Sequence, residues 1–586
     1  MEEKMTTPRL STASATRIPL EVLLGNPERA AVQISPDGTK IGFIAPRDGV
    51  LNVWVGDRDA DLDDFQAMTN DRTTGVRSWF WSQDSRRILF LKDTDGDEDF
   101  HLRGIDLASG QETDYTPFEG TRAYPGKRSR KDPEKMMVSL NRENPDRHEP
   151  YRLDLATGAL EKLADNPGNI LGWTLDEDLV VRQASVGKPD GGRVMRVRDS
   201  ADDEWRDLFT MTMEEVGISQ TLQFDADGSG LYMIDTRNRN AAAFVRMDLA
   251  DGSTKEIYAE DRYDVTGVVF DRTTSEPIIA VVLRENIALV PLDDRYADDI
   301  AMLETLGVDG TTCEVVINSR SDDDRYWTLS VDTSERSPYY LLYDRTEKTH
   351  RTLFSMRPAL DDYNLAPMES FAFDARDGLR VEGYVTFPPE AERTNLPMVV
   401  NVHGGPWTRD TWGYHPEAQW LANRGFICMQ VNYRGSTGYG NEFMNAGNRE
   451  WGGKMHDDLI DAIGWAVEKG YADRDRVAIY GGSYGGFAAL VGATMTPEVF
   501  RCSVALVGPS NLISFINSIP EYWKPMLAML KKRVGDPETE PDFLKSRSPL
   551  THVDQIAIPM LVAHGANDPR VKQAESEQIV AAMKEK

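Results

Sequence analysis

Residues 476–490 read RVAIYGGSYGGFAAL: an apolar run, a cluster of glycines around one serine, and an alanine-rich run. The first part is typical of a buried β-strand and the last of a helix. Between them a G-x-S-x-G pattern places Ser483 between Gly481 and Gly485. Glycines permit a tight, strained strand-to-helix turn that lifts the serine hydroxyl out of the sheet, and a helix N-terminus favours developing negative charge. We therefore predict that Ser483 is a catalytic nucleophile.

The sequence on both sides of this turn alternates between apolar runs and helical stretches. A strand pair is predicted over 369–389 and a helix over 456–470. Apolar strands that alternate with helices indicate a parallel sheet with both faces covered. We therefore predict an α/β-hydrolase domain over residues 356–586, with a mostly parallel, doubly wound sheet. Its strands are expected at 397–402, 426–433, 476–482, 502–508 and 559–565.

A second motif supplies the groups that a serine nucleophile needs beside it. Acyl transfer passes through a tetrahedral oxyanion, which is stabilised by one N–H after the nucleophile and one from a loop after an earlier strand. Here Tyr484 follows the serine, and HGGP at 403–406 follows the strand at 397–402. We predict that Tyr484 and Gly405 form this oxyanion hole. His403 precedes the nucleophile, whereas this fold orders its triad as Ser, acid, His, so we expect His403 to shape its loop.

The acid of the predicted triad follows the last apolar strand, where residues 567–571 read NDPRV. An Asp just beyond the carboxyl end of a strand can reach a histidine above the sheet. Asp568 could instead be a surface-turn residue before a proline. Its position after the nucleophile and at a strand end favours the catalytic interpretation, and we predict Asp568 as the acid.

The first half of the chain contains a repeat with spacings of 45–51 residues. Each copy is a short run of alternating apolar residues that ends in Asp, and a turn rich in Asp, Gly and Ser precedes several copies, as in SPDG at 35–38. Such a period with several short strands is typical of propeller blades, whereas the strands of a β-sandwich do not require a constant long period. We predict an all-β seven-bladed β-propeller over residues 26–355, after an N-terminal extension at 1–25. The seven aspartates, expected to be turn or capping groups, are Asp57, Asp106, Asp154, Asp199, Asp248, Asp293 and Asp344.

Composition argues against several classes of function. Lys and Arg number 66 against 96 Asp and Glu, and the net charge of −30 disfavours a nucleic-acid partner. Residues 1–16 lack the apolar core of a signal peptide, and no run approaches the roughly 18 apolar residues that cross a bilayer. We therefore expect a cytoplasmic protein without a membrane partner. The three cysteines and the histidines lack metal-ligand spacing, and no phosphate-binding glycine loop is present, so we expect no metal and no cofactor.

Five motifs follow one another along the second half: HGGP (403–406), NYRGSTGYG (432–440), WGGKMHDDL (451–459), YGGSYGGF (480–487) and HGANDPRV (564–571). In this order they resemble the prolyl oligopeptidase family of serine peptidases, most closely its bacterial branch similar to acylaminoacyl-peptidases and dipeptidyl-peptidases. The resemblance covers the hydrolase half densely and the propeller half by architecture. It implies a serine-type oligopeptidase or exopeptidase that hydrolyses short peptides through an acyl-enzyme, under a propeller that admits only short peptides. It also implies that Arg570 helps to hold the backbone of the bound peptide.

One part of the family's pattern is missing. The family places its catalytic His a few tens of residues after the acid, but no histidine follows His564 and the chain stops at Lys586. We therefore expect the catalytic His, and with it the last strand and helix of the sheet, to be absent. A C-terminally truncated copy of an active peptidase is favoured over a natural protein that lost catalysis, because residues 581–586 fall in a helical pattern without a stop signal. Little or no peptidase activity is expected, since loss of the triad His costs on the order of 10⁶ in kcat.

Two other functions stay open at this point. The same triad cleaves esters, so an esterase-like acyl hydrolase is one alternative, and a catalytically inactive propeller protein that binds peptides is the other. Trp523 is predicted to line a substrate pocket, although large aromatic residues more often belong to the core. Glu214 and Glu215 have the composition of the paired Glu with which dipeptidyl-peptidases hold a free N-terminus, but two solvated acids explain them better. The sequence leaves peptide specificity and oligomeric state open.

Overall fold

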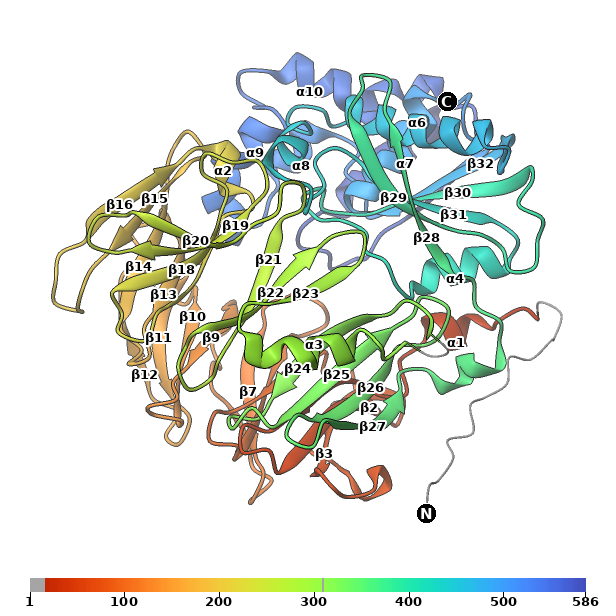
Figure 1. Cartoon of the computed structure of the whole chain (residues 1–586). Coiled ribbons are helices and arrows are strands. Elements are labelled where there is room, and N and C mark those ends of the chain that lie inside the picture. The colour runs from red at the N-terminus through yellow and green to blue at the C-terminus, as the bar shows by residue number, and fades with distance from the viewer. Residues whose placement is uncertain (1–15, 308–309) are drawn as a thin grey trace.

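The computed structural model describes residues 16–307 and 310–586 and consists of a β-propeller and an α/β domain that lie one against the other (Figure 1). This confirms the predicted fold class. Most of the predicted extension at 1–25 lies outside the described residues. Its last part forms α1 (Leu20–Leu24), which packs against the α/β domain, where Ile18 N–H donates to Asn423 Oδ1 at 2.8 Å.

Seven antiparallel sheets form the blades of the propeller. Blade 1 comprises β1 (Ala30–Ile34), β2 (Lys40–Arg47), β3 (Val50–Asp57) and β4 (Gln66–Ala67). Blade 2 comprises β5 (Ser78–Trp81), β6 (Arg87–Lys92), β7 (His101–Asp106) and β8 (Glu112–Asp114). Blade 3 comprises β9 (Ala123–Arg128), β10 (Lys135–Leu140), β11 (Glu149–Asp154) and β12 (Leu160–Lys162). Blades 4 and 5 comprise β13 (Ile170–Leu175), β14 (Val181–Gly187), β15 (Arg193–Val197) and β16 (Arg206–Met211), then β17 (Gln220–Phe224), β18 (Gly230–Asp235), β19 (Ala243–Asp248) and β20 (Thr254–Tyr258).

The last two blades depart from the pattern and close the ring. Blade 6 has three strands, β21 (Val265–Phe270), β22 (Pro277–Leu283) and β23 (Ile287–Pro291), and α3 (Ala297–Leu303) follows them. Blade 7 comprises β24 (Glu314–Arg320), β25 (Tyr326–Asp332), β26 (Tyr339–Asp344) and β27 (Thr349–Ser355). It joins blade 1 through hydrogen bonds such as Ile34 N–H to Ser319 Oγ at 2.7 Å. The first and last blades are therefore held together without a shared strand.

Five of the seven repeated aspartates, Asp248 among them, have the turn or capping role that the sequence predicts, whereas Asp57 and Asp199 pair with Lys40 and Arg206. Asp106, Asp154 and Asp344 each end the third strand of a blade, and each accepts hydrogen bonds from backbone N–H groups two or three residues ahead. Asp293 instead follows β23 and caps the short 3₁₀ helix η2 (Asp294–Tyr296) through Arg295 N–H at 2.9 Å. These side chains therefore organise turns, because an Asp at a strand end satisfies the N–H groups of the chain that bends away.

The α/β domain is built on one seven-stranded sheet with the order β28-β29-β31-β30-β32-β33-β34. The strands β28 and β29 are antiparallel, and β31, β30, β32, β33 and β34 are parallel. The edge strand β34 leaves Leu561 54% exposed. The strands are β28 (Met368–Asp374), β29 (Arg380–Thr386), β30 (Leu396–Val402), β31 (Ile427–Asn432), β32 (Ala472–Gly482), β33 (Cys502–Leu506) and β34 (Met560–Ala563).

Helices cover the sheet. The helix α7 has 11 buried residues of 12, because it runs through the core directly after β32. The helices are α4 (Pro416–Asn423), α5 (Asn441–Asn445), α6 (Lys454–Glu468), α7 (Tyr484–Met495), α8 (Leu512–Asn517), α9 (Leu527–Arg533), α10 (Pro541–Arg547) and α11 (Ala574–Glu585), with the 3₁₀ helices η5 (Glu521–Met526) and η6 (Pro549–Gln555). In the described part of the chain, no helix combines the length and the apolar character needed to span a membrane.

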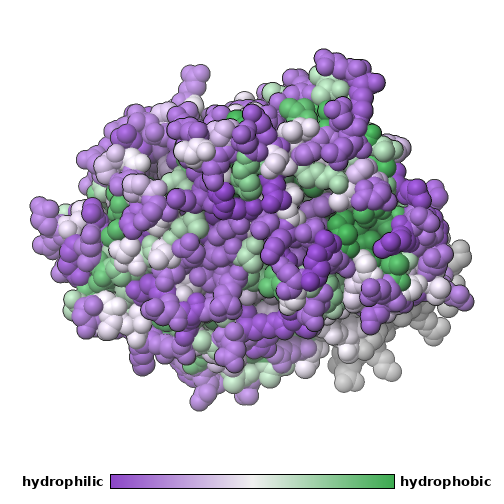
Figure 2. All heavy atoms as spheres, turned by 90° about the horizontal axis from the view of Figure 1, so that it is seen from above, coloured by the Kyte–Doolittle hydropathy of each residue, from purple (hydrophilic) through white to green (hydrophobic). Residues whose placement is uncertain are grey.

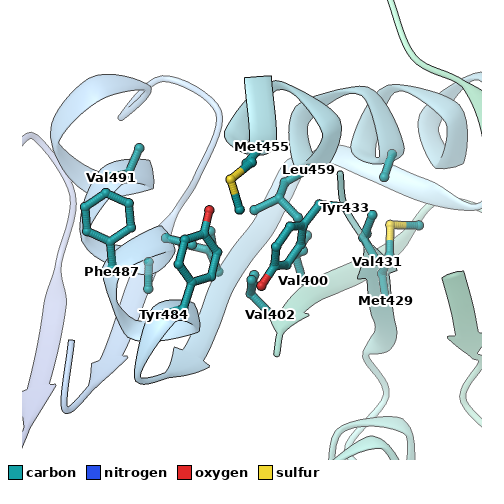
Figure 3. Packing of buried hydrophobic residues seen from close by; sticks show 14 of the residues in the cluster. Val400, Val402, Met429, Val431, Tyr433, Met455, Leu459, Tyr484, Phe487 and Val491 are labelled. Atoms are coloured by element: carbon teal, nitrogen blue, oxygen red, sulfur yellow. The ribbon is translucent and has the colours of Figure 1, made fainter. Parts of the chain in front are cut away.

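The largest apolar core lies between this sheet and its helices (Figure 3). Val400 and Val402 of β30 pack there with Met455 and Leu459 of α6 and with the ring of Tyr484. Burying side chains of this size contributes about 1.5–3 kcal/mol each, so the core holds the ends of β30 and β32 in a fixed relation. The face seen from above is mostly hydrophilic with smaller apolar patches (Figure 2), in keeping with the net charge of −30.

The two bodies meet mainly along blades 5 to 7. Asp264, between blades 5 and 6, accepts a hydrogen bond from Gly440 N–H at 3.1 Å, and Asp332 of blade 7 accepts one from Tyr414 N–H at 2.8 Å. A separate contact forms at blade 2, where Asn567 Nδ2 donates to the Asp95 carbonyl at 2.9 Å. The propeller is therefore attached to the α/β domain at two places, and the second lies next to the predicted catalytic acid.

Candidate active site

Ser483 lies at the turn between β32 and α7. Its φ is +58°, which is unusual for a residue with a Cβ and marks a strained backbone. The neighbouring glycines show why the turn needs them. A Cβ on Gly481 would lie 2.6 Å from the Val402 carbonyl oxygen, and a Cβ on Gly485 would overlap that same oxygen. The G-x-S-x-G pattern is thus a packing requirement of this turn, which presses against the end of β30.

The HGGP loop lies directly against the serine. A Cβ on Gly404 would be 3.3 Å from the Gly482 carbonyl oxygen and 3.5 Å from Ser483 Cβ. Gly405 follows with φ +114°, a conformation that favours glycine, and it is exposed. The structure therefore brings the loop with the predicted oxyanion-hole glycine to the nucleophile turn, as the motif spacing predicts.

Tyr484 combines a buried side chain with a helix-initial backbone. Its ring packs 4.7 Å from the ring of Trp451 and 5.2 Å from that of Tyr433 (Figure 3). Burial raises the pKa of the Tyr484 phenol well above its ordinary value, so the hydroxyl stays protonated. Because Tyr484 is the first residue of α7, its N–H belongs to the group that has no intrahelical acceptor. The side chain anchors the helix, and the N–H remains suited to stabilising an oxyanion.

His403 is held within its own loop. Its Nδ1 lies 2.7 Å from the Gly404 carbonyl oxygen, and its Nε2 lies 3.0 Å from Ser436 Oγ. The ring stacks on Tyr433 with centroids 4.4 Å apart. Burial lowers the pKa of His403, which keeps the imidazole neutral. These contacts confirm the expectation that His403 shapes the loop.

Asp568 lies in the turn that follows β34. Its Oδ1 accepts hydrogen bonds from the N–H groups of Arg570 at 2.9 Å and of Val571 at 3.0 Å, and the side chain is half-buried. The structure places the carboxylate beyond the carboxyl end of a parallel strand, where the sequence predicts it. It does not bring a histidine to it: within residues 16–307 and 310–586, the rings of the α/β domain bond groups other than Ser483 and Asp568. These rings are His403, His415, His456, His552 and His564.

Arg570 reaches across to the propeller. Its Nη2 forms an ion pair with Glu98 Oε1 at 3.2 Å. The other oxygen of Glu98 accepts hydrogen bonds from Arg122 at 3.3 Å and from the Tyr522 hydroxyl at 3.4 Å, and the Arg122 guanidinium lies 3.8 Å from the centre of the Tyr522 ring. A propeller carboxylate therefore contacts the predicted peptide-binding residue Arg570, two positions after the predicted acid. Single sequence motifs do not predict a site role for Glu98, although the acidic run DTDGDEDF at 93–100 indicates an unusual loop.

Trp523 lines a chamber of about 780 Å³ between η5 and the inner strands of blades 3 to 5. Its walls include Tyr124, His148 and Arg193 from the propeller. The lining of this chamber in the described chain does not include Ser483, so the structure supports a pocket role for Trp523 without joining it to the serine. Glu214 is exposed, whereas Glu215 is half-buried and caps α2 (Met213–Val216) by accepting the Thr212 N–H at 2.8 Å.

Sequence comparison adds a relationship that covers almost the whole chain. The chain is 42% identical over 585 residues to dipeptidyl aminopeptidase BIII of Pseudoxanthomonas mexicana, which covers 98% of this chain and 84% of that protein. The model of the prolyl oligopeptidase family matches residues 412–586. The chain belongs to the prolyl oligopeptidase family. A second relative, dipeptidyl peptidase family member 6 of Caenorhabditis elegans, is 32% identical over 609 residues and covers 97% of this chain and 81% of its own length.

Solved structures agree with the fold of a prolyl oligopeptidase. A puromycin hydrolase superposes with a TM-score of 0.74 at 19% identity, covering 98% of this chain and 90% of that one. A prolyl endopeptidase superposes with a TM-score of 0.77 at 15% identity, covering 96% of this chain and 84% of that one. Membership of the family makes this protein a serine peptidase that acts on peptides. The turn at Ser483 is where the fold places a nucleophile.

Proposed function

We propose that Ser483 attacks the carbonyl carbon of a short peptide and forms an acyl-enzyme that water then hydrolyses. The N–H groups of Tyr484 and Gly405 stabilise the oxyanion, and Asp568 is the acid of the triad. The observation that carries the proposal is the strained backbone of Ser483 at the start of α7, with Gly404 packed against it. A single oxyanion-hole donor is worth about 2.7–4 kcal/mol of transition-state stabilisation.

The attack also needs a general base to accept the serine proton. The α/β-domain histidines of the described chain bond other groups, so the proposal assigns the base to none of them. Added imidazole can test the nucleophile separately, because a small base with a pKa near neutrality can enter where a side chain is lacking. We expect hydrolysis of a chromogenic dipeptide amide to rise with imidazole in the unaltered chain and to stay at background in Ser483→Ala.

Each outcome of that assay is informative. Ordinary turnover without imidazole means that a residue of this chain already serves as the base. No imidazole response, together with no fluorophosphonate labelling of Ser483, contradicts the nucleophile assignment and favours a peptide-binding propeller. A response confined to ester substrates favours the esterase-like alternative.

The same proposal extends to the substrate: a peptide with a free amino terminus from which dipeptides are released. Both relatives named above are dipeptidyl peptidases by name, and they share 42% and 32% of the aligned residues. Glu98 is the candidate partner of the substrate ammonium, because it is a propeller carboxylate that reaches the α/β domain beside Asp568 and Arg570. Arg570 is then free to hold the peptide backbone, as the family resemblance implies.

Binding to the Ser483→Ala variant tests this choice without turnover. A tripeptide with a free amino terminus should bind more tightly than its N-acetylated form. Glu98→Gln should remove the difference in affinity between the two tripeptides. We expect this variant to weaken binding of the free-amino tripeptide about tenfold or more, since a hydrogen bond to a charged group contributes about 1.5–3 kcal/mol. Glu112→Gln on the same blade, where Glu112 pairs with Arg103 at 3.2 Å, is the matched control and should change nothing. Equal binding of both tripeptides contradicts the exopeptidase proposal. A cytoplasmic location and the absence of a nucleic-acid partner stay predictions from composition.

A further inference from the structure

The propeller has a second cavity, on the side away from the α/β domain. Contacts to that domain come from turns between second and third strands and from links between blades, as at Asn240 and Asp264. The turns between first and second strands therefore face the opposite way, and they line a cavity of about 430 Å³. This cavity shares Gly126, Lys127 and Gln223 with the chamber that Trp523 lines. It is therefore the far mouth of the propeller channel.

Positive charge is concentrated at this mouth, although the whole chain carries a net charge of −30. Glu177 is the one carboxylate among its lining residues in the described chain. Five cationic side chains line the same cavity: Lys127, Arg128, Arg130, Arg272 and Arg320. Lys127, Arg128 and Arg130 come from one run in blade 3, whereas Arg272 and Arg320 come from blades 6 and 7, so the fold is needed to bring the two groups together. The fold gathers them around the channel axis.

Three of the five cations have carboxylate partners. Lys127 pairs with Glu177 at 2.7 Å, Arg272 with Asp322 at 2.9 Å and Arg320 with Asp324 at 2.5 Å. The other two, Arg128 and Arg130, form no ion pair with any residue that the structure describes. Each of them donates to a backbone carbonyl instead, Arg128 to Trp81 at 2.6 Å and Arg130 to Arg272.

The arginines at this mouth lie close enough together to repel one another. Arg128 is half-buried and Arg130 is exposed, and the backbone carbonyls that they contact satisfy single N–H donors without balancing the positive charge. Burial lowers the pKa of Arg128, and burial together with repulsion from Arg320, Arg128 and Arg130 lowers the pKa of Arg272 to about 10, although the Asp322 carboxylate opposes both shifts. Guanidinium groups bind oxyanions through paired N–H donors, so an oxyanion among them would offset their mutual repulsion.

We propose that this mouth is a binding site for a small oxyanion, held by Arg128 and Arg130 and surrounded by Arg272 and Arg320. The oxyanion is either free, as inorganic phosphate, or the C-terminal carboxylate of a peptide that extends from the chamber into the channel. The second source rests on the proposed peptidase function, and the first does not. The concentration of positive charge in an acidic protein also steers anions to this mouth.

Calorimetric titration of the full chain tests the site with three ligands: inorganic phosphate, a tetrapeptide free acid and its C-terminal amide. We expect phosphate or the free acid to bind, and Arg128→Gln or Arg130→Gln to weaken that binding about tenfold or more. Arg196→Gln is the matched control, because Arg196 is a propeller arginine paired with Asp207 at 2.7 Å on the exposed surface. It should leave the affinity unchanged.

The outcomes separate the two sources and can overturn the site. Binding of phosphate identifies a free oxyanion site, whereas binding of the free acid alone identifies the peptide carboxylate. If neither binds the unaltered chain, or if Arg196→Gln weakens binding as much as the other two variants, the proposal is wrong. Arg130 is exposed, so Arg130→Gln should fold even where Arg128→Gln does not. The measurement uses no turnover, and its failure is therefore distinct from a failure of the role of Ser483.

Discussion

Replacing Arg434 by Met should destabilise the α/β domain by about 3–5 kcal/mol. Arg434 belongs to the NYRGSTGYG motif at 432–440, and it is 3% exposed while its partner Asp458 is 0% exposed. Its Nε and Nη2 donate to the two oxygens of Asp458 at 2.9 and 2.7 Å, and its backbone N–H donates at 2.9 Å. Removing one member of a buried pair leaves an uncompensated charge, which typically costs this amount.

The penalty should depend on pH in a defined direction. Burial raises the pKa of Asp458, and the Arg434 guanidinium opposes that rise. Without Arg434 the pKa of Asp458 rises further. A carboxyl whose pKa is raised in the folded state contributes stability at low pH, and that contribution is lost as pH increases through the folded pKa. Arg434→Met should therefore cost more at pH 8 than at pH 5.

Urea unfolding followed by fluorescence at both pH values measures the effect. Arg376→Met is the matched control, because Arg376 makes two similar bonds to Asp461, at 2.9 and 2.7 Å, but is about half exposed. An exposed pair contributes about 0–1 kcal/mol. The double variant Arg434→Met/Asp458→Asn should recover much of the loss. A penalty equal to that of the control, or one that is larger at pH 5, refutes the reasoning.

Three further outcomes follow from single contacts. In a melting experiment, Gly485→Ala should lower stability by about 3 kcal/mol, since the added Cβ would overlap the Val402 carbonyl oxygen. The control Gly482→Ala should cost under about 1 kcal/mol, because nothing lies within 4 Å of a Cβ at that position. Burial raises the pKa of Glu314 to about 7, so the stability that its protonated carboxyl contributes is lost as pH rises through 7. In urea titrations, Glu314→Gln should therefore raise the free energy of unfolding by roughly 3 kcal/mol at pH 8 and leave it unchanged below pH 4. The described α/β-domain histidines bond groups other than Ser483, so residues 1–586 tested without imidazole should turn over dipeptide amides on the order of 10⁶ more slowly than a complete triad. Rapid turnover that depends on Ser483 would contradict this histidine geometry.

The repeat predicted the propeller because its blades obey one local rule, but blade 6 shows where such a rule fails. The run IALVPLD ending at Asp293 looks like the third strand of a blade, and β23 is indeed that strand. The next segment is α3, whose Asp299 is fully buried and accepts hydrogen bonds from the Tyr343 hydroxyl at 2.6 Å and Arg345 at 2.7 Å. Those partners lie in blade 7, more than 40 residues away, so a reading of local pattern could not find them.

The candidate active site also has one part that the local sequence predicts and one part that it does not. Ser483, Tyr484 and the HGGP loop were predictable, because a strand, a glycine turn and a helix in sequence leave few ways to fold. The contact of Glu98 with Arg570 was not, because it joins residues 472 positions apart through the docking of two domains. Sequence motifs describe the part of the candidate site that one domain builds, whereas the Glu98–Arg570 contact comes from the packing of the propeller against that domain.

The turns that reveal the propeller in the sequence also explain the charge at its far mouth. SQDS at 82–85 is a turn between first and second strands, and its Gln83 bonds Asp322 at 2.8 Å in the matching turn of blade 7. Every blade places such a turn at the same end of the channel, so cations at the turns and strand ends of blades 3, 6 and 7 meet in one cluster. A repeat architecture therefore converts scattered residues into one site, and the α/β domain leaves this end of the channel uncovered. The two ends of the propeller can thus carry different chemistry, an acidic Glu98 facing the serine domain and unpaired arginines facing away from it.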